Sequence, residues 1–275
     1  MKVLGIQAMH MISGLMVDSR LNNDIQRRNI DSFRREYKSL QLLRHPNVVQ
    51  YLTFCNYPCG NFPMIVMELL DSSLERYLTH SSPKILIQIS LSRDVASALE
   101  YLHQKNIIHR DLCGSNILLQ ERIPTPVAKV SDFGLSKIID GNDDSWSTLV
   151  MCRKAYIPPE IREDPKSYDL RIDIFMLGVV ILQIAHGIHC IKDREHRSDL
   201  IRNTPSEHPL KTVIIECVKA KELRPKAAKI AEIMKDIIAN NNTNDDQLAE
   251  ATKRLQVNES DSDSGDSFHS CVSDL

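Results

Sequence analysis

The spacing of apolar residues predicts that the chain changes from strands to helices as it proceeds. Residues 48–54 and 62–69 are rich in β-branched and apolar side chains and are separated by turn-forming residues, so we expect a pair of strands. Residues 24–43 and 85–104 carry apolar side chains at spacings of three and four, which predicts amphipathic helices. From about residue 154 to about residue 239 the pattern is mostly helical.

The longest apolar run extends from Ile172 to Ile188. It is interrupted by Asp173, Gln183 and His186, and it is shorter than the roughly 20 apolar residues that a membrane span requires. We therefore expect a buried core helix here and no membrane span.

Composition and charge limit the class of protein. With 275 residues and 42% hydrophobic content, the chain is long enough to form one or two lobes with a sizeable core. A net charge of −2 gives no indication of a nucleic-acid surface. From residue 240 onward the chain is rich in Asn, Asp and Ser, and residues 256–275 contain acidic residues but no Lys or Arg. We expect this tail to be disordered.

The cysteines indicate a reducing environment. Seven are scattered along the chain and no signal peptide precedes them, so we expect free thiols and a cytoplasmic protein. Cys55 and Cys59 form the only close pair, and no second pair at zinc-ligand spacing follows. A zinc site is therefore not expected.

Three polar residues suggest the chemistry. Asp111 lies five residues before Asn116, between apolar segments, and Asp132 follows within an Asp-Phe-Gly sequence. A carboxylate that orients a hydroxyl group, together with amide and carboxylate oxygens that hold Mg²⁺, is what phosphoryl transfer from ATP requires. Each residue taken singly would more often belong to a capped turn. Their order and spacing favour the chemical role.

Together these residues resemble the catalytic loop and the metal-binding Asp-Phe-Gly of protein kinases. The resemblance implies that Asp111 is the catalytic base and that Asn116 and Asp132 are catalytic residues that bind Mg²⁺. Further matches are the end of an activation segment at 158–160, a central helix and a late arginine. They imply that Asp173 bonds to the catalytic-loop backbone and that Glu160 pairs with Arg224.

Residues 67–70 resemble the hinge of a kinase. The resemblance places Met67 at the back of the adenine pocket, backbone groups around Glu68 and Leu70 against the base edge, and Leu118 beneath the base. It also implies an apolar column that aligns two lobes, formed by Leu40, Tyr51, His109 and Phe133.

The N-terminal part departs from the kinase pattern. The glycine-rich loop that covers the ATP phosphates is missing, and only Gly5 and Gly14 precede residue 60. Lys2 resembles the strand lysine that pairs with a helix glutamate, here Glu36, but the two lie 34 residues apart. Either residues between Gln7 and Asn29 form an insertion, or the lysine is absent.

We therefore expect an α+β, two-lobed protein-kinase-like fold. Residues 1–68 would form a partial N-lobe without the glycine loop, residues 69–239 a helical C-lobe, and residues 240–275 an acidic tail. The resemblance implies a signal-transduction enzyme of the tyrosine-kinase-like group that transfers the γ-phosphate of ATP, with Mg²⁺, to Ser/Thr or alternatively Tyr of protein substrates. The alternative is a pseudokinase or truncated kinase that acts as a binding or scaffolding module. The C-terminal Ser273-Asp274-Leu275 fits a PDZ-type ligand.

Overall fold

The computed structural model describes residues 7–8, 43–56, 63–122, 124–133, 136–138, 154–163 and 169–241. Several expectations lie outside these residues. They are Lys2, Glu36, Leu40, most of the helix expected at 24–43, the acidic tail and the C-terminal tripeptide. Leu43 is described, and it is not helical.

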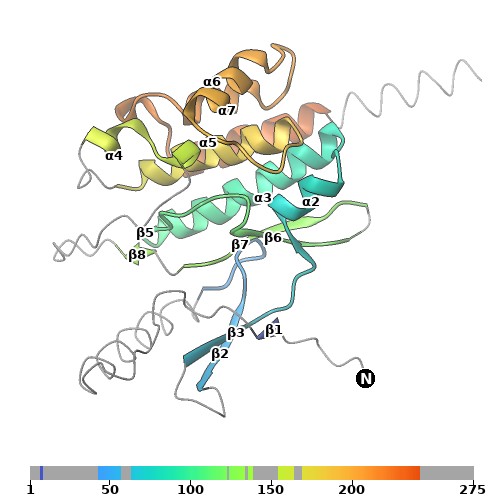
Figure 1. Cartoon of the computed structure of the whole chain (residues 1–275), viewed down its shortest axis with the longest axis vertical. Coiled ribbons are helices and arrows are strands. Elements are labelled where there is room, and N and C mark those ends of the chain that lie inside the picture. The colour runs from blue at the N-terminus through green and yellow to red at the C-terminus, as the bar shows by residue number, and fades with distance from the viewer. Residues whose placement is uncertain are drawn as a thin grey trace, which may run out of the picture.

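The smaller part of the molecule contains a three-stranded antiparallel sheet in the order β1-β3-β2 (Figure 1). Its strands are β1 (Gln7–Ala8), β2 (Tyr51–Asn56) and β3 (Pro63–Met67). Strands β2 and β3 confirm the predicted pair, although both are shorter than expected. Their register shifts between Tyr51 and Thr53, which marks a β-bulge.

The larger part is helical. Its first two helices are α2 (Leu74–His80), which Ser73 caps by accepting a hydrogen bond from the Arg76 amide at 3.2 Å, and α3 (Ile85–Gln104). The ends of α3 match the prediction because its apolar stripe is regular throughout. The later elements are the 3₁₀ turn η1 (Lys154–Tyr156), α4 (Pro159–Glu163), α5 (Arg171–Ala185), α6 (Arg194–Asn203), α7 (Lys211–Cys217), the turn η2 (Lys221–Leu223) and a helix over 227–241.

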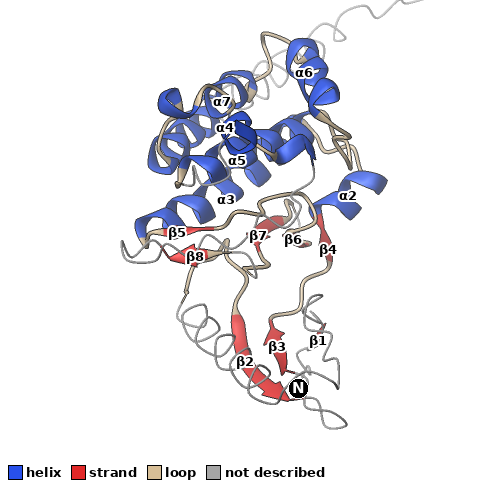
Figure 2. Ribbon diagram, turned by 60° about the vertical axis from the view of Figure 1, so that its left-hand side comes forward, coloured by secondary structure: helices blue, strands red, loops and turns tan. Residues whose placement is uncertain are grey.

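Short strands lie between the helices and the β1-β3-β2 sheet (Figure 2). Strands β4 (Ser72–Ser73), β6 (Ile117–Gln120) and β7 (Val127–Val130) form a second antiparallel sheet in the order β4-β6-β7. Strand β5 (Ile107–Ile108) pairs with β8 (Lys137–Ile138). The loop that contains Asp111 therefore leaves β5 and enters β6.

Helix α5 forms the centre of the core, with α3 on one side and α6 and α7 on the other (Figures 1 and 2). Its residues from Ile172 to Ile184 are all buried, which explains the long apolar run. The helix ends at Ala185, before the end of that run, because Gly187 adopts a φ of +60° that stops the helix. Among the described residues, no helix is long and apolar enough to cross a membrane.

The described residues confirm an α+β fold with a small strand-rich lobe and a larger helical lobe. The domain boundaries stay a prediction. The last described helix continues to residue 241, past the expected boundary at 239.

Candidate active site

The side chain of Asn116 ties the two ends of the loop between β5 and β6 together. Its Nδ2 donates hydrogen bonds to the backbone carbonyl and to the Oδ2 carboxylate oxygen of Asp111, both at 2.8 Å. A turn between the Asn116 amide and the Cys113 carbonyl, at 3.0 Å, keeps the loop short. The Asp111 carboxylate is thereby held in one orientation.

A buried carboxylate on α5 supports the same loop from below. Asp173 has no exposed surface, and its two oxygens accept hydrogen bonds from the backbone amides of His109 at 2.8 Å and Arg110 at 2.9 Å. This confirms the expected contact between Asp173 and the catalytic-loop backbone. Arg110 has a φ of +68°, a strained value for a residue other than glycine, so the loop needs this support.

His103, at the end of α3, was not predicted to take part. Its Nε2 lies 3.0 Å from Asp173 Oδ2. Burial by itself would raise the pKa of the Asp173 carboxyl, but the hydrogen bond and charge of His103, with smaller contributions from His109, hold that pKa below its ordinary value of 3.8. The only signal in the sequence was a basic residue in the last turn of a helix.

Asp132 is brought next to Asn116 by the pairing of β6 with β7. The ladder ends with Ile117 opposite Val130, and the Ser131 amide and hydroxyl then donate to the Asn116 carbonyl at 2.8 and 2.9 Å. Asp132 follows directly, with a φ of +59°. The structure therefore brings all three predicted catalytic residues to the end of the sheet where β6 begins and β7 ends.

The donor set fits a magnesium ion. Asn116 and Asp132 supply amide and carboxylate oxygens, which are the hard ligands that Mg²⁺ prefers. No group of three or more His, Cys, Asp or Glu side chains suited to a metal occurs among the described residues. A site of two protein ligands is sufficient for Mg²⁺, since substrate phosphates and water complete its shell.

The predicted hinge has backbone groups available for a ligand. The Glu68 amide donates to the Gln50 carbonyl at 3.0 Å, so this N–H is engaged. Within the described part of the chain, the Glu68 carbonyl and the amide and carbonyl of Leu70 make no hydrogen bond. Met67 and Leu70 are buried in the core, and Leu118 on β6 packs against that core. The arrangement fits the edge of a planar base.

The hinge side chain makes a contact that the sequence did not suggest. Glu68 accepts two hydrogen bonds from Lys129 Nζ, both at 2.8 Å, and a third from the Gln50 amide at 2.8 Å. Lys129 lies on β7 directly opposite Leu118. This ion pair connects the hinge to the sheet that leads to Asp132, across 61 positions of sequence.

The apolar column is present in its described members. The Phe133 ring contacts those of Tyr51 and His109 edge to face, with centroid distances of 5.9 and 5.1 Å. His109 Nε2 also lies 2.9 Å from the Ser131 carbonyl oxygen. Phe133 thus links strand β2 of the small lobe to the catalytic loop.

The predicted ion pair between Glu160 and Arg224 is confirmed. Arg224 Nη1 and Nη2 donate to the two carboxylate oxygens of Glu160 at 2.5 and 2.8 Å, and the arginine side chain is fully buried. Arg224 also lies over the Phe175 ring, 4.9 Å from its centroid. The end of the activation segment is therefore anchored to α5.

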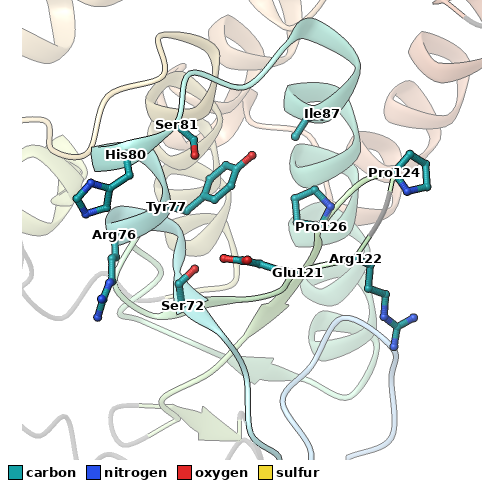
Figure 3. A pocket seen from close by; sticks show the side chains of 10 residues that line it. All are labelled: Ser72, Arg76, Tyr77, His80, Ser81, Ile87, Glu121, Arg122, Pro124 and Pro126. Atoms are coloured by element: carbon teal, nitrogen blue, oxygen red, sulfur yellow. The ribbon is translucent and has the colours of Figure 1, made fainter.

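A cavity of about 490 Å³ lies elsewhere on the helical lobe, between α2 and the connection from β6 to β7 (Figure 3). The Tyr77 ring and the Glu121 carboxylate point toward its middle, whereas Arg76 and Arg122 point away from it. Its described lining includes none of the predicted site residues. This cavity is separate from the candidate active site.

Comparison with known proteins agrees with this geometry. The sequence model of the protein kinase domain family matches residues 16–254. A putative L-type lectin-domain containing receptor kinase V.1 of Arabidopsis thaliana is 31% identical over 196 residues, which cover 69% of this chain and 29% of that protein. The probable serine/threonine-protein kinase kinX of Dictyostelium discoideum is 29% identical over 231 residues, covering 79% of this chain and 20% of that protein. The chain thus spans less than a third of the length of these relatives.

Proposed function

Because this chain belongs to the protein kinase family, we propose that it transfers the γ-phosphate of ATP to hydroxyl groups of protein substrates. One observation carries the proposal. Asn116 holds the Asp111 carboxylate, while Asp173 fixes the two residues that precede it. A carboxylate that is fixed on both sides can receive a substrate hydroxyl in one orientation.

We assign Asp111 the role of orienting the acceptor hydroxyl and accepting its proton at Oδ1 or Oδ2. The transition state of phosphoryl transfer is loose, so the position of this carboxylate matters more than its basicity. Asn116 has two roles in this proposal. Its Nδ2 keeps Asp111 in place, and its Oδ1 would supply an oxygen ligand for Mg²⁺.

Asn116 and Asp132 would hold Mg²⁺, which neutralises charge on the phosphates when it is bound. The Glu68 carbonyl and the Leu70 backbone groups would pair with the adenine edge, with Met67 behind the base and Leu118 beneath it. Lys2 and Glu36 stay predictions for the phosphate-binding ion pair, since both lie outside the described residues.

We further propose serine and threonine as the acceptors and the tyrosine-kinase-like group as the subfamily. Several relatives of this chain, kinX among them, are named as serine/threonine-protein kinases. Residues 43–51 resemble the tyrosine-kinase-like group, although Cys113 occupies the position two residues after Asp111, where serine/threonine kinases usually have Lys. A cytoplasmic location and a PDZ-type partner stay predictions.

The experiment that tests the proposal is incubation of the purified chain with Mg·ATP and casein, followed by mass spectrometry of the casein. We expect phosphoserine and phosphothreonine with the wild type and a large loss with Asp111→Asn. Equal and negligible phosphorylation by both proteins would instead favour a binding or scaffolding role.

A further inference from the structure

Two arginine side chains stack on one aromatic ring in the helical lobe. The ring belongs to Phe175 of α5, which is buried. The guanidinium carbon of Arg197, from α6, lies 4.8 Å from its centroid, and that of Arg224 lies 4.9 Å from it. Both distances are within the range of cation–π attraction.

Each of these arginines also holds one end of a short stretch of the activation segment. Arg197 Nη1 donates to the Ala155 carbonyl at 2.5 Å, and Arg224 binds the Glu160 carboxylate. Ala155 has no exposed surface and lies in the turn η1. Residues 155 to 160 are therefore held at both ends by side chains that share one ring.

The same stretch is connected to the catalytic loop. The Tyr156 hydroxyl donates to Gln183 Oε1 at 2.6 Å, and Gln183 Nε2 donates to the His189 carbonyl at 2.7 Å. Gly114 of the catalytic loop packs so closely on Gln183 that a Cβ there would lie 2.7 Å from Oε1. The Gln183 side chain thus connects the turn at 154–156 to the loop that carries Asp111.

We propose that Arg197 is a positioning residue for the protein substrate. It holds residues 154–156 in the shape in which they receive the acceptor polypeptide beside Asp111. The inference rests on the proposed function, because it specifies how the same site receives its acceptor. A polypeptide that presents a hydroxyl to Asp111 has to pass this neighbouring segment.

The planar guanidinium is needed for both contacts of Arg197. Its guanidinium carbon lies over the Phe175 ring while Nη1 reaches the Ala155 carbonyl, a combination that the point charge of lysine cannot reproduce fully. Arg197 is also the single buried residue of α6, whose other side chains are mostly exposed. Its contacts with Ala155 and Phe175 are made with η1 and α5, which carry none of the predicted nucleotide-binding residues.

This separation predicts a split in the kinetic constants. Loss of the Arg197 contacts should raise the KM for the protein acceptor, by about fivefold or more for one hydrogen bond to a charged donor. The KM for ATP should stay the same. A general loss of folding would instead lower kcat without this selectivity.

The test uses the full chain and three variants. Arg197→Met removes the hydrogen bond to Ala155 and the cation–π contact with Phe175 while keeping an unbranched apolar stem, and Arg197→Lys keeps the positive charge and N–H donors. Arg202→Met on the same helix is the control, since Arg202 is exposed and pairs only with Asp199 among the described residues. Hydrogen–deuterium exchange over residues 154–163 is measured together with steady-state kinetics for casein and ATP.

We expect Arg197→Met to speed exchange in this segment and to raise the casein KM alone. Arg197→Lys should be intermediate, and Arg202→Met should match the wild type. Unchanged exchange in Arg197→Met, or faster exchange with an unchanged casein KM, would overturn the proposal. If the wild type transfers no phosphate, the proposed function fails. The exchange measurement then still decides whether Arg197 holds the segment: faster exchange in Arg197→Met supports this role, and unchanged exchange overturns it.

Discussion

At the scale of single residues, the site depends on a few hydrogen bonds to side chains that carry no reacting atom. Asn116 fixes Asp111 from the side, and Asp173 fixes the preceding backbone from below. The sequence predicted these residues because their types and spacing follow a known pattern. It did not predict His103 or Arg197, because their partners lie 70 and 42 positions away and no local pattern marks the contacts.

Asn116→Ala should lower phosphate transfer by roughly a hundredfold or more, since it removes both the support of Asp111 and a proposed metal ligand. The measurement is kcat for casein phosphorylation at saturating Mg·ATP. Asn203→Ala, at the exposed end of α6, is the matched control and should retain full activity. An Asn116→Ala protein with wild-type kcat would contradict the assigned role.

Asp173 should make stability depend on pH in the acidic range. Its pKa is lowered in the folded protein, so its contribution to stability is complete above its ordinary value of 3.8 and is lost as the pH falls through the lower folded value. The difference in the free energy of unfolding between wild type and Asp173→Asn should therefore shrink as the pH falls below 3.8. Urea unfolding between about pH 3 and pH 6 checks this, and a constant difference would refute it.

At the scale of elements, regular patterns were predicted well and tertiary contacts were not. Helix α3 has the predicted ends, and the buried apolar run of α5 was recognised as a core helix. The start of β2 was placed too early because the apolar residues Val48 and Val49 precede the paired segment, and the end of β3 was placed too late because apolar residues continue into the hinge. The close approach of α5 to α7 had no signal beyond the presence of Gly178.

Gly178→Ala should destabilise the protein by about 1–3 kcal/mol. An alanine usually stabilises the interior of a helix relative to glycine, but here its Cβ would lie 2.5 Å from the Cys217 Cβ on α7. Chemical denaturation measures the change. The double variant with Cys217→Gly should lose less than the sum of the two single variants, and a stabilised Gly178→Ala protein would contradict the packing.

At the level of the whole molecule, polar contacts near the hinge join the described parts of the two lobes. Before β2, the Asn47 carbonyl and the Val49 amide bond to the two backbone groups of Val130 at 2.8 and 2.9 Å. On the hinge itself, Glu68 binds Lys129. The two-lobed fold was predictable from the order of strands and helices, whereas this joint was not, because it forms between segments far apart in sequence.

The hinge ion pair should have a measurable but modest coupling energy. The exposed fractions of Lys129 and Glu68 are 13% and 24%, so solvent screens the pair only partly, and we expect about 0.5–1 kcal/mol from a double-mutant cycle of Glu68→Gln and Lys129→Met. The pair of Lys229 and Glu232 is the control, since both are more than half exposed. Its coupling should be smaller, and equal values for the two pairs would contradict a special role at the hinge.

Above all, we propose that this chain transfers phosphate through Asp111. The most direct measurement is the transfer of labelled γ-phosphate from Mg·ATP to casein by the wild type and by Asp111→Asn, with nucleotide binding measured for both. We predict that Asp111→Asn binds nucleotide as the wild type does but transfers phosphate about a hundredfold more slowly or worse. Equal transfer rates for the two proteins, or no transfer by the wild type, would refute this role of Asp111.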